Sequence, residues 1–284
     1  MIQKVRKGEE LNENSLKKFL FENEFISNNK SDLFISQFTN GFSNLTYLIK
    51  IENKELVLRC PPKGAVKYGH DMGREFKVLC GLNKGFKKAP IAHVFSDNIK
   101  IIGKPFYIME KIEGIILSKK EADSRNIRSS EYTKIAQNWL NTFVELHQID
   151  YNKIGLNDLG KPKGYVKRQV RNWSKQYLIA ATEEIPESYK IMDWLEKNQP
   201  KKYNYSLIHN DYKYDNIVFS DDSWNKIQAI LDWEMCTLGD PLMDFGTSLA
   251  YWTMASDHIK ILDGLNYPTA KPGNPGRMEL VDMY

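Results

Sequence analysis

Hydrophobic and polar positions alternate in short runs through the first third of the chain. Such runs of branched and aromatic residues are typical of strands, and the polar step Glu52-Asn53-Lys54 suits a hairpin turn. The expected strands are 34–38, 45–51, 55–59, 94–95, 100–102 and 106–109. Two segments, 14–27 and 70–82, instead repeat their apolar residues with helical spacing. The pattern predicts a β-rich N-terminal lobe over residues 1–110.

Helical periodicity dominates the rest of the chain. The expected helices are 132–147, 163–181, 188–198 and 241–254, and the last of these has a proline in its first turn. A compact polar segment, 206–233, interrupts them with short apolar runs at its edges, and the Pro- and Gly-rich stretch 266–277 predicts a loop. The fold class is therefore α+β, with a mainly helical C-terminal lobe over residues 111–284.

Composition and charge exclude several classes of protein. Hydrophobic residues make up 42% and charged residues 27%, as in a soluble globular protein rather than a disordered one. The longest apolar run, 177–181, is far shorter than the roughly 20 residues of a membrane-spanning helix. Residues 1–10 are too polar for a signal peptide. We expect a cytoplasmic protein without a membrane partner.

Metal-binding cysteine motifs and nucleic-acid signatures are both missing from the sequence. Cys60, Cys80 and Cys236 are far apart and form no C-x-x-C pair, which predicts free thiols that are buried or half-buried. The formal net charge of +4 is spread along the chain, and no basic stripe alternates with aromatic residues. Nucleic acid is not expected as a partner, whereas a locally bound anionic ligand stays open. The sequence indicates no oligomeric state.

Polar side chains follow apolar strands at two places in the second half of the chain. The run Leu207-Ile208 leads into a loop that contains Asp211 and Asn216, and another apolar strand ends in Asp232. Magnesium prefers such hard oxygen ligands and usually keeps water and phosphate as the others. In phosphoryl transfer, one aspartate accepts the hydroxyl proton, and an asparagine five residues later and a further aspartate hold the metal. The spacing predicts Asp211 as the catalytic base and Asn216 and Asp232 as magnesium ligands.

These motifs together resemble the aminoglycoside phosphotransferase/choline kinase family. The resemblance rests on H-x-D-x-x-x-x-N at 209–216, on the strand ending in Asp232, and on Gly-Asp-Pro-x-x-Asp at 239–244. It is similar to the branch whose kinase-like domains are fused to acyl-CoA dehydrogenases. The segments that match this branch are 42–47, 56–62, 70–72, 164–166 and 231–234. The resemblance implies a protein-kinase-like fold of two lobes, with ATP and Mg²⁺ as cofactors.

By the same resemblance, the N-terminal lobe holds the nucleotide. The loop 40–44 would cover the phosphates, with Ser43 and Asn44 adding side-chain donors. It contains one glycine and is not a G-x-G-x-x-G match, so an ordinary hairpin is the alternative. The adenine edge would bond to backbone groups near Glu110 and Ile112.

Arg59 stands where most kinases of this architecture have the lysine that contacts the α- and β-phosphates. Glu75 on the following helix is its expected partner, because a guanidinium can bind a carboxylate or a phosphate through two N–H groups. Arginine and lysine are not interchangeable, so the geometry must differ from that of the lysine kinases.

Several other residues have alternative interpretations. The resemblance implies that Asp244 braces the catalytic loop and that Asp240 caps the helix at 241, both as structural residues. His209 would order the loop. His147 is expected to be a capping or core histidine rather than a ligand. Lys213 either steadies the transferring phosphoryl group or has no catalytic role.

The resulting hypothesis is a small-molecule kinase that transfers the γ-phosphoryl group of ATP to a hydroxyl group. The resemblance suggests a hydroxyacyl-CoA or a hydroxy acid as acceptor, and Tyr165, Trp173 and Tyr177 either line its pocket or belong to the core. The alternative is a non-catalytic nucleotide- or metabolite-binding module with a kinase fold. The run 278–284 is typical of a helix that has just begun, and the branch that the chain resembles usually continues for several helices, so truncation of the C-terminal lobe stays open.

Overall fold

The computed structural model describes residues 2–28, 30–39, 43–64, 70–258 and 268–284. The chain forms two compact units, and neither is continuous in sequence. Unit 1 comprises Met1–Leu117 and Asp215–Met235, and unit 2 comprises Ser118–Tyr214 and Cys236–Tyr284. This division does not coincide with the expected boundary at residue 110, because Asp215–Met235 joins the N-terminal residues.

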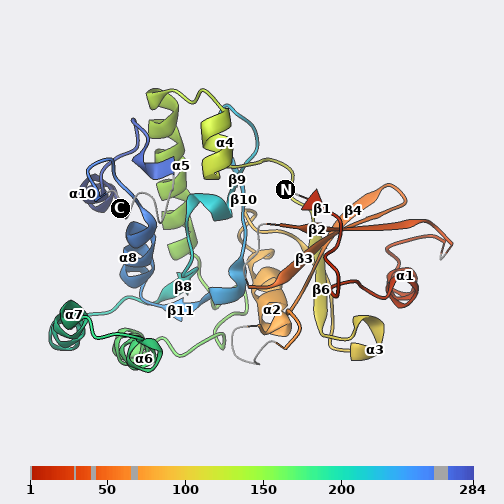
Figure 1. Cartoon of the computed structure of the whole chain (residues 1–284), viewed down its shortest axis with the longest axis horizontal. Coiled ribbons are helices and arrows are strands. Elements are labelled where there is room, and N and C mark those ends of the chain that lie inside the picture. The colour runs from red at the N-terminus through yellow and green to blue at the C-terminus, as the bar shows by residue number, and fades with distance from the viewer. Residues whose placement is uncertain (1, 29, 40–42, 65–69, 259–267) are drawn as a thin grey trace. The chain divides into compact units, whose positions relative to one another are not determined.

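Unit 1 contains an antiparallel sheet of six strands (Figure 1). Its order is β1-β2-β3-β4-β6-β5. The strands are β1 (Ile2–Gln3), β2 (Leu33–Phe38), β3 (Leu45–Ile51), β4 (Lys54–Cys60), β5 (Ala92–Ser96) and β6 (Phe106–Glu110). Pairing of Ile51 with Lys54 confirms the predicted hairpin at Glu52-Asn53. Glu52 has φ of 52°, a left-handed conformation that suits such a tight turn.

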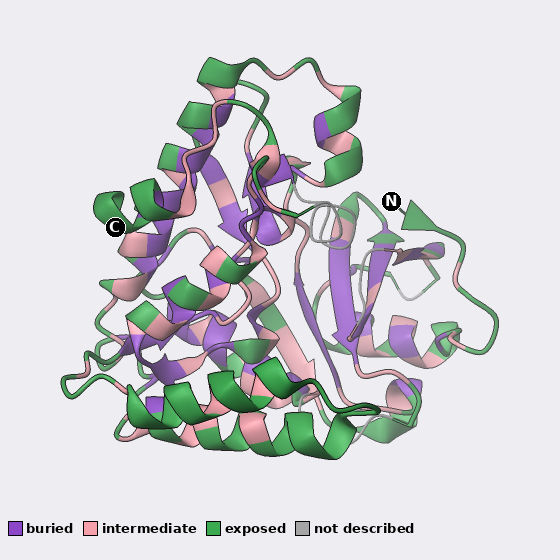
Figure 2. Cartoon of the chain, turned by 60° about the vertical axis from the view of Figure 1, so that its left-hand side comes forward, coloured by how far each residue is buried: buried purple, intermediate pink, exposed green. Residues whose placement is uncertain are grey.

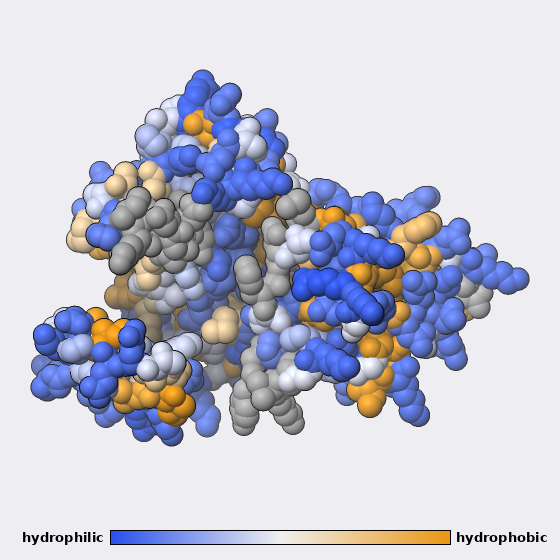
Figure 3. Space-filling view, viewed as in Figure 1, coloured by the Kyte–Doolittle hydropathy of each residue, from blue (hydrophilic) through white to orange (hydrophobic). Residues whose placement is uncertain are grey.

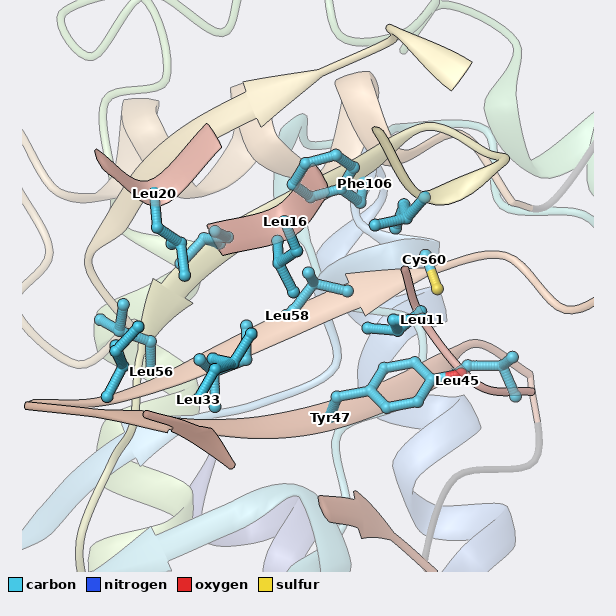
Figure 4. Close-up of a cluster of buried hydrophobic side chains, with 14 of the residues drawn as sticks. Leu11, Leu16, Leu20, Leu33, Leu45, Tyr47, Leu56, Leu58, Cys60 and Phe106 are labelled. Carbon is cyan, nitrogen blue, oxygen red and sulfur yellow. The ribbon is translucent and has the colours of Figure 1, made fainter. Parts of the chain in front are cut away.

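Helices α1 (Glu13–Glu22) and α2 (Met72–Leu82) accompany this sheet. Asn12 and Asp71 cap them, each accepting a hydrogen bond from a backbone N–H in the first turn at 3.0 Å. Leu16 and Leu20 of α1 are fully buried in an apolar cluster that also contains Tyr47, Leu58 and Phe106 of the sheet (Figure 4). This core holds the strand that carries Arg59 in a fixed position.

One predicted strand of unit 1 is wrong. Residues 100–102 lie in the short helix α3 (Ile99–Ile102) rather than in a strand. Asn98 caps this helix by accepting from the N–H of Lys100 at 3.0 Å, and Gly103 ends it with φ of 84°. A short apolar run does not distinguish the two structures by periodicity, and the capping residues decide. The predicted helix 14–27 is also shorter, because it ends at Glu22.

A second, smaller sheet completes unit 1. It pairs β7 (Ile115–Ile116), β9 (Ile217–Phe219) and β10 (Ile227–Ile230) in the order β10-β9-β7, with both pairs antiparallel. The short 3-10 helix η2 (Trp233–Met235) follows β10. The side chain of Trp233 is buried, donates its Nε1–H to the carbonyl of Ile230 at 2.9 Å, and lies edge-on to Phe86. These contacts fix the turn that contains Asp232.

Unit 2 is mainly helical, as the sequence predicts. Its helices are α4 (Lys119–Ser124), α5 (Ser129–His147), α6 (Tyr165–Ala180), α7 (Pro186–Lys197), α8 (Pro241–Tyr251) and α10 (Arg277–Met283). Strands β8 (Ser206–Ile208) and β11 (Thr237–Gly239) pair as a two-stranded ribbon. Burial differs sharply among the helices: α5 has a buried face, whereas α7 has no buried residue (Figure 2).

Exposed apolar side chains gather on α6 and α7 (Figure 3). They include Leu178, Ile179, Ile191 and Leu195. Among the helices that the structure describes, none has an apolar stretch long enough to cross a bilayer. Cys60, Cys80 and Cys236 are free thiols that are buried or half-buried, as predicted.

Candidate active site

The predicted catalytic loop follows β8 in unit 2. Asn210 has φ of 65°, which is unusual for a residue other than glycine, although asparagine tolerates it better than most. This conformation turns the chain immediately before Asp211. His209 is fully buried, and its Nδ1 accepts the N–H of Asp211 at 3.2 Å, so it orders the loop as predicted.

Asp244 on α8 braces this loop. Its carboxylate is fully buried and accepts the backbone N–H groups of His209 and Asn210, both at 2.7 Å. These two bonds stabilise the left-handed conformation of Asn210 against its intrinsic cost. Asp240 caps α8 by accepting the N–H of Leu242 at 2.9 Å. Both structural contacts are therefore confirmed.

Aromatic side chains anchor the loop on both flanks of Asp211. Tyr212 is fully buried, donates its hydroxyl to the carbonyl of Trp139 at 2.8 Å, and stacks on Phe143 with 4.0 Å between ring centroids. Tyr214 is buried as well. Tyr165, at the start of α6, is also buried and donates to Asn210 Oδ1 at 3.3 Å. Residues of α5 and α6 therefore contact this loop, in addition to Asp244 of α8.

Asp211 and Lys213 alternate with these anchors and stay partly accessible. Lys213 Nζ donates to Asp211 Oδ1 at 2.9 Å, and the two side chains are 21% and 19% exposed, respectively. A carboxylate that is fixed in this way can accept a proton from a bound hydroxyl group. The ammonium beside it can attract a phosphate.

Asn216 and Asp232, the predicted magnesium ligands, both belong to unit 1. The pairing of Ile217 with Ile230 places Asn216 beside Leu231, and the N–H of Leu231 donates to the carbonyl of Asn216 at 2.8 Å. Asp232 follows at once with φ of 66°. The structure thus brings these two residues together at the ends of β9 and β10.

Arg59 on β4 binds three carboxylates. Its Nη1 lies 2.7 Å from Glu75 Oε1, and its Nη2 lies 2.9 Å from Asp232 Oδ1 and 3.3 Å from Glu234 Oε2. The predicted pairing of Arg59 with Glu75 is confirmed as a contact. The link to Asp232 ties the arginine to a predicted metal ligand. Arg59 uses a different nitrogen atom for Glu75 and for Asp232, whereas a lysine has a single nitrogen and could not reproduce this geometry.

Burial and charge act in opposite directions in this cluster. Burial raises the pKa of Glu75 to about 7, although Arg59 opposes this shift. Burial disfavours the charged form of Arg59, but Glu75 and the other neighbouring acids outweigh it, so its pKa is well above the ordinary value. Burial also raises the pKa of Glu234.

Glu234 also holds the residues that were predicted to contact phosphate. Its Oε2 accepts Asn44 Nδ2–H at 2.6 Å, and Ser43 is hydrogen-bonded to the same carboxylate. Because Asn44 donates through Nδ2, its Oδ1 faces His70 Nδ1 at 2.9 Å as an acceptor. Residues 40–42 of the predicted loop lie outside the described residues. A phosphate-binding role for Ser43 and Asn44 stays a prediction.

The segment near Glu110 and Ile112, which was predicted to bind adenine, already uses one of its backbone N–H groups within the sheet. The N–H of Glu110 donates to the carbonyl of Ile91 at 2.8 Å, because β5 pairs with β6. Glu110 Oε2 accepts the N–H of Ile91 in return at 3.1 Å. Any contact with a nucleotide would therefore use other backbone groups, such as those of Ile112.

Asn216 and Asp232 fit magnesium in their chemistry. Both offer hard oxygen atoms, and the carboxylate of Asp232 is 34% exposed. Across the ranges that the structure describes, no group of three or more His, Cys, Asp or Glu residues could hold a metal ion.

Two residues of the site were not assigned a role from the sequence. Glu234 belongs to a quoted motif, but its contact with Asn44 joins residues 190 positions apart. Tyr251, at the end of α8, lies beside Lys213 and Asp211 and belongs to no motif.

His147 was expected to be a core or capping residue. It is buried and belongs to the network around Asp244.

Comparison with known proteins identifies the family. A model described as "Phosphotransferase enzyme family" matches residues 35–277. The chain belongs to this family. The mouse acyl-CoA dehydrogenase family member 10 is 32% identical over 283 residues, and the rat family member 11 is 33% identical over 263 residues. These matches cover 99% and 92% of the chain, but only 26% and 33% of the relatives. The chain thus spans about a quarter to a third of these relatives.

Solved structures show the same fold. A Ralstonia eutropha protein, provisionally assigned as an aminoglycoside phosphotransferase, superposes with a TM-score of 0.79 at 29% identity and covers 97% of this chain and 80% of its own. A streptomycin–ATP complex of an aminoglycoside phosphotransferase superposes with a TM-score of 0.55 at 19% identity. This match covers 91% of this chain and 84% of the other chain. The α+β, kinase-like fold is therefore confirmed.

Proposed function

We propose that the chain is an ATP- and Mg²⁺-dependent kinase of a small molecule with a hydroxyl group. The observation that supports this most directly is Asp211, whose carboxylate is fixed by Lys213 on a loop braced by the buried Asp244. Asn216 and Asp232 add a matched pair of oxygen ligands. Membership of the phosphotransferase family supports the same reaction class.

In the proposed reaction, the acceptor oxygen attacks the γ-phosphorus and the bond to the bridging oxygen of ADP breaks. Asp211 accepts the proton that leaves the acceptor hydroxyl. Lys213 stabilises the negative charge of the transferred group. Asn216 and Asp232 hold Mg²⁺, which neutralises phosphate charge when it is bound. Arg59 keeps Asp232 and Glu75 in place, and Ser43 and Asn44 contact the phosphates.

The acceptor is proposed to be anionic, such as a hydroxyacyl-CoA or a hydroxy acid. The segment 161–175 contains six basic residues, and no acidic residue occurs between Leu159 and Thr182. The segment meets the catalytic loop through Tyr165. Positive charge in this place suits an anion and disfavours a polycation such as an aminoglycoside. The acyl-CoA dehydrogenase relatives point to the same class.

A non-catalytic nucleotide- or metabolite-binding module is the second candidate. The observation that favours it is Arg59, which stands in the lysine position and binds the predicted metal ligand Asp232 at 2.9 Å. A nucleotide would have to compete with this ion pair or use the remaining N–H groups. Nucleotide binding without turnover would support this second function.

The test is Mg²⁺-dependent consumption of ATP with a panel of hydroxyacyl-CoAs, hydroxy acids, homoserine, choline and aminoglycosides. Asp211→Asn and Asp211→Ala should abolish turnover and leave ATP affinity nearly unchanged, because Asp211 acts on the acceptor. Asp193→Asn, on the exposed face of α7, is the matched control. Turnover that survives both Asp211 variants would contradict the assignment. ATP binding without turnover on any acceptor would favour the non-catalytic module.

A further inference from the structure

Tyr251 is the last residue of α8 and lies against both partly exposed residues of the catalytic loop. Lys213 Nζ lies 4.9 Å from the centroid of the Tyr251 ring, within the range of a cation–π contact. The hydroxyl of Tyr251 is hydrogen-bonded to Asp211. Because Lys213 also donates to Asp211 at 2.9 Å, the three side chains form a closed set of contacts.

The Tyr251 ring borders a small cavity. This cavity has a volume of about 10 Å³, which is room for about one water molecule, and Lys213 lines it as well. The walls of this cavity are aromatic for the most part and include Trp139, Tyr212, Tyr214 and Trp252. A phenol ring cannot turn inward into so small a space.

The protonation of Tyr251 agrees with a donor role. Burial, followed by the nearby Asp211, raises the pKa of the phenol, so the hydroxyl stays protonated at neutral pH. A protonated hydroxyl can donate to the Asp211 carboxylate, whereas a phenolate would repel it. Lys213 favours the ionised phenol, but this effect is smaller than those of burial and Asp211.

We propose that Tyr251 is a positioning residue, which orients Asp211 through its hydroxyl and holds the Lys213 ammonium against its ring. The inference rests on the proposed kinase function, because it concerns the arrangement of the proposed base. Without the ring, Lys213 loses its cation–π contact and keeps its bond to Asp211, so its ammonium is held less firmly. Without the hydroxyl, Asp211 keeps its bond to Lys213 but loses the hydrogen bond from Tyr251 that helps to orient its carboxylate.

Two variants separate these contributions. Tyr251→Phe keeps the ring and removes the hydroxyl, and we expect kcat to fall about threefold to tenfold. Tyr251→Leu removes both, and we expect a fall of about 10- to 100-fold. The KM for ATP should change less than about twofold in both variants, because the proposed nucleotide ligands lie on other elements. Tyr189→Leu on the exposed α7 is the matched control and should retain the parental kcat.

A second measurement needs no turnover. Lysine side chains are acetylated with a limiting amount of an N-hydroxysuccinimide ester, and the labelling rate of Lys213 is measured by mass spectrometry. Tyr251→Leu should raise this rate at least about twofold, because the ammonium of Lys213 loses its cover. Tyr251→Phe and Tyr189→Leu should leave the rate unchanged.

The combined outcomes distinguish the positioning role from the proposed function. Unchanged labelling of Lys213 in Tyr251→Leu would overturn the positioning role. So would a loss of activity accompanied by an equal loss of ATP affinity and of the circular dichroism of the fold. Increased labelling in a protein that turns over no acceptor would support the contact, while the kinase function itself would fail.

Discussion

His147 Nε2 lies 3.1 Å from Asp244 Oδ2, and both side chains are buried. Because a carboxylate can only accept, Nε2 carries the hydrogen. In the neutral imidazole, Nδ1 is then an acceptor, and it faces the hydroxyl of Tyr284 at 2.6 Å. Tyr284 therefore donates to His147, and His147 donates to Asp244. Asp244 in turn holds the N–H groups of His209 and Asn210.

Replacement of His147 by Phe should loosen the catalytic loop. Asp244 would keep its two backbone donors but lose the third, and a buried carboxylate with an unpaired lone pair costs about 1–3 kcal/mol of unfolding free energy. Amide hydrogen exchange in peptides covering 207–213 should accelerate. His147→Gln, whose amide can still donate, should show a smaller effect. Equal exchange rates in the parent and both variants would mean that the histidine does not support the loop.

Removal of the Arg59 charge should be among the most destabilising changes in unit 1. The guanidinium is 9% exposed and compensates Glu75, whose side chain is 2% exposed. Arg59→Met leaves this buried carboxyl unpaired and should cost about 3–5 kcal/mol in urea unfolding. Arg59→Lys should lose less, since one ion pair can persist. If Glu75→Gln restores none of the stability of Arg59→Met, the pair is not energetically coupled.

Asp232→Asn should weaken binding of a divalent cation. The substitution keeps the volume of the side chain and an oxygen atom that can accept from Arg59. It removes the negative charge that a hard cation needs. The affinity for Mn²⁺ in the presence of a nucleotide, measured by electron paramagnetic resonance, should fall at least about tenfold. Asp222→Asn, on the exposed turn between β9 and β10, serves as the control. An unchanged Mn²⁺ affinity would remove Asp232 from the proposed ligand set.

Gly114 cannot accept a side chain. It has φ of 146°, and an added Cβ would lie 2.2 Å from the carbonyl oxygen of Phe219. Because the clash is with backbone of β9, Gly114→Ala should cost about 2–4 kcal/mol and displace β7 from β9. Gly103 also has a positive φ, 84°, but open space around it. Gly103→Ala should therefore cost only about 1–2 kcal/mol. Similar losses for both variants, compared by urea unfolding, would mean that the close approach is relieved elsewhere.

The proposed catalytic loop could be recognised in the sequence because its residues lie close together along the chain. Asp211 and Asn216 lie five positions apart on one loop, and Asp232 ends a recognisable apolar strand. The Asp240 cap of α8 could also be predicted, since a capping side chain bonds within its own first turn. The family resemblance predicted a pair of Arg59 and Glu75, and the structure shows these two side chains in contact with each other.

The remaining interactions depend on tertiary packing. The bond between Asn44 and Glu234 joins residues 190 positions apart, and no local pattern encodes it. Tyr251 meets Lys213 only because α8 ends beside the loop. The helix at 99–102 was missed since a short segment of three isoleucines and one lysine suits a strand equally well. The assignment of 215–235 to unit 1 follows from the pairing of β7 with β9, which the sequence does not specify.

Glu55 should make the stability of unit 1 depend on pH. Hydrogen bonds from Lys111 and Lys50 lower its pKa from 4.5 to about 2. A carboxyl group with a lowered folded-state pKa stabilises the fold above pH 4.5, and this contribution is lost as the pH falls toward 2. Glu55→Gln should therefore have a lower urea midpoint than the parent at pH 7, and the difference should shrink between pH 4.5 and 3.

The matched control for this prediction is Glu113→Gln. Glu113 also binds Lys111, but its side chain is 77% exposed, and its loss leaves Glu55 bonded to both lysines. The difference between this variant and the parent should stay smaller than that of Glu55→Gln at pH 7, because exposed ion pairs contribute little. A difference for Glu55→Gln that stays constant from pH 7 to 3 would mean that the lysines stabilise the strand without lowering the pKa of Glu55.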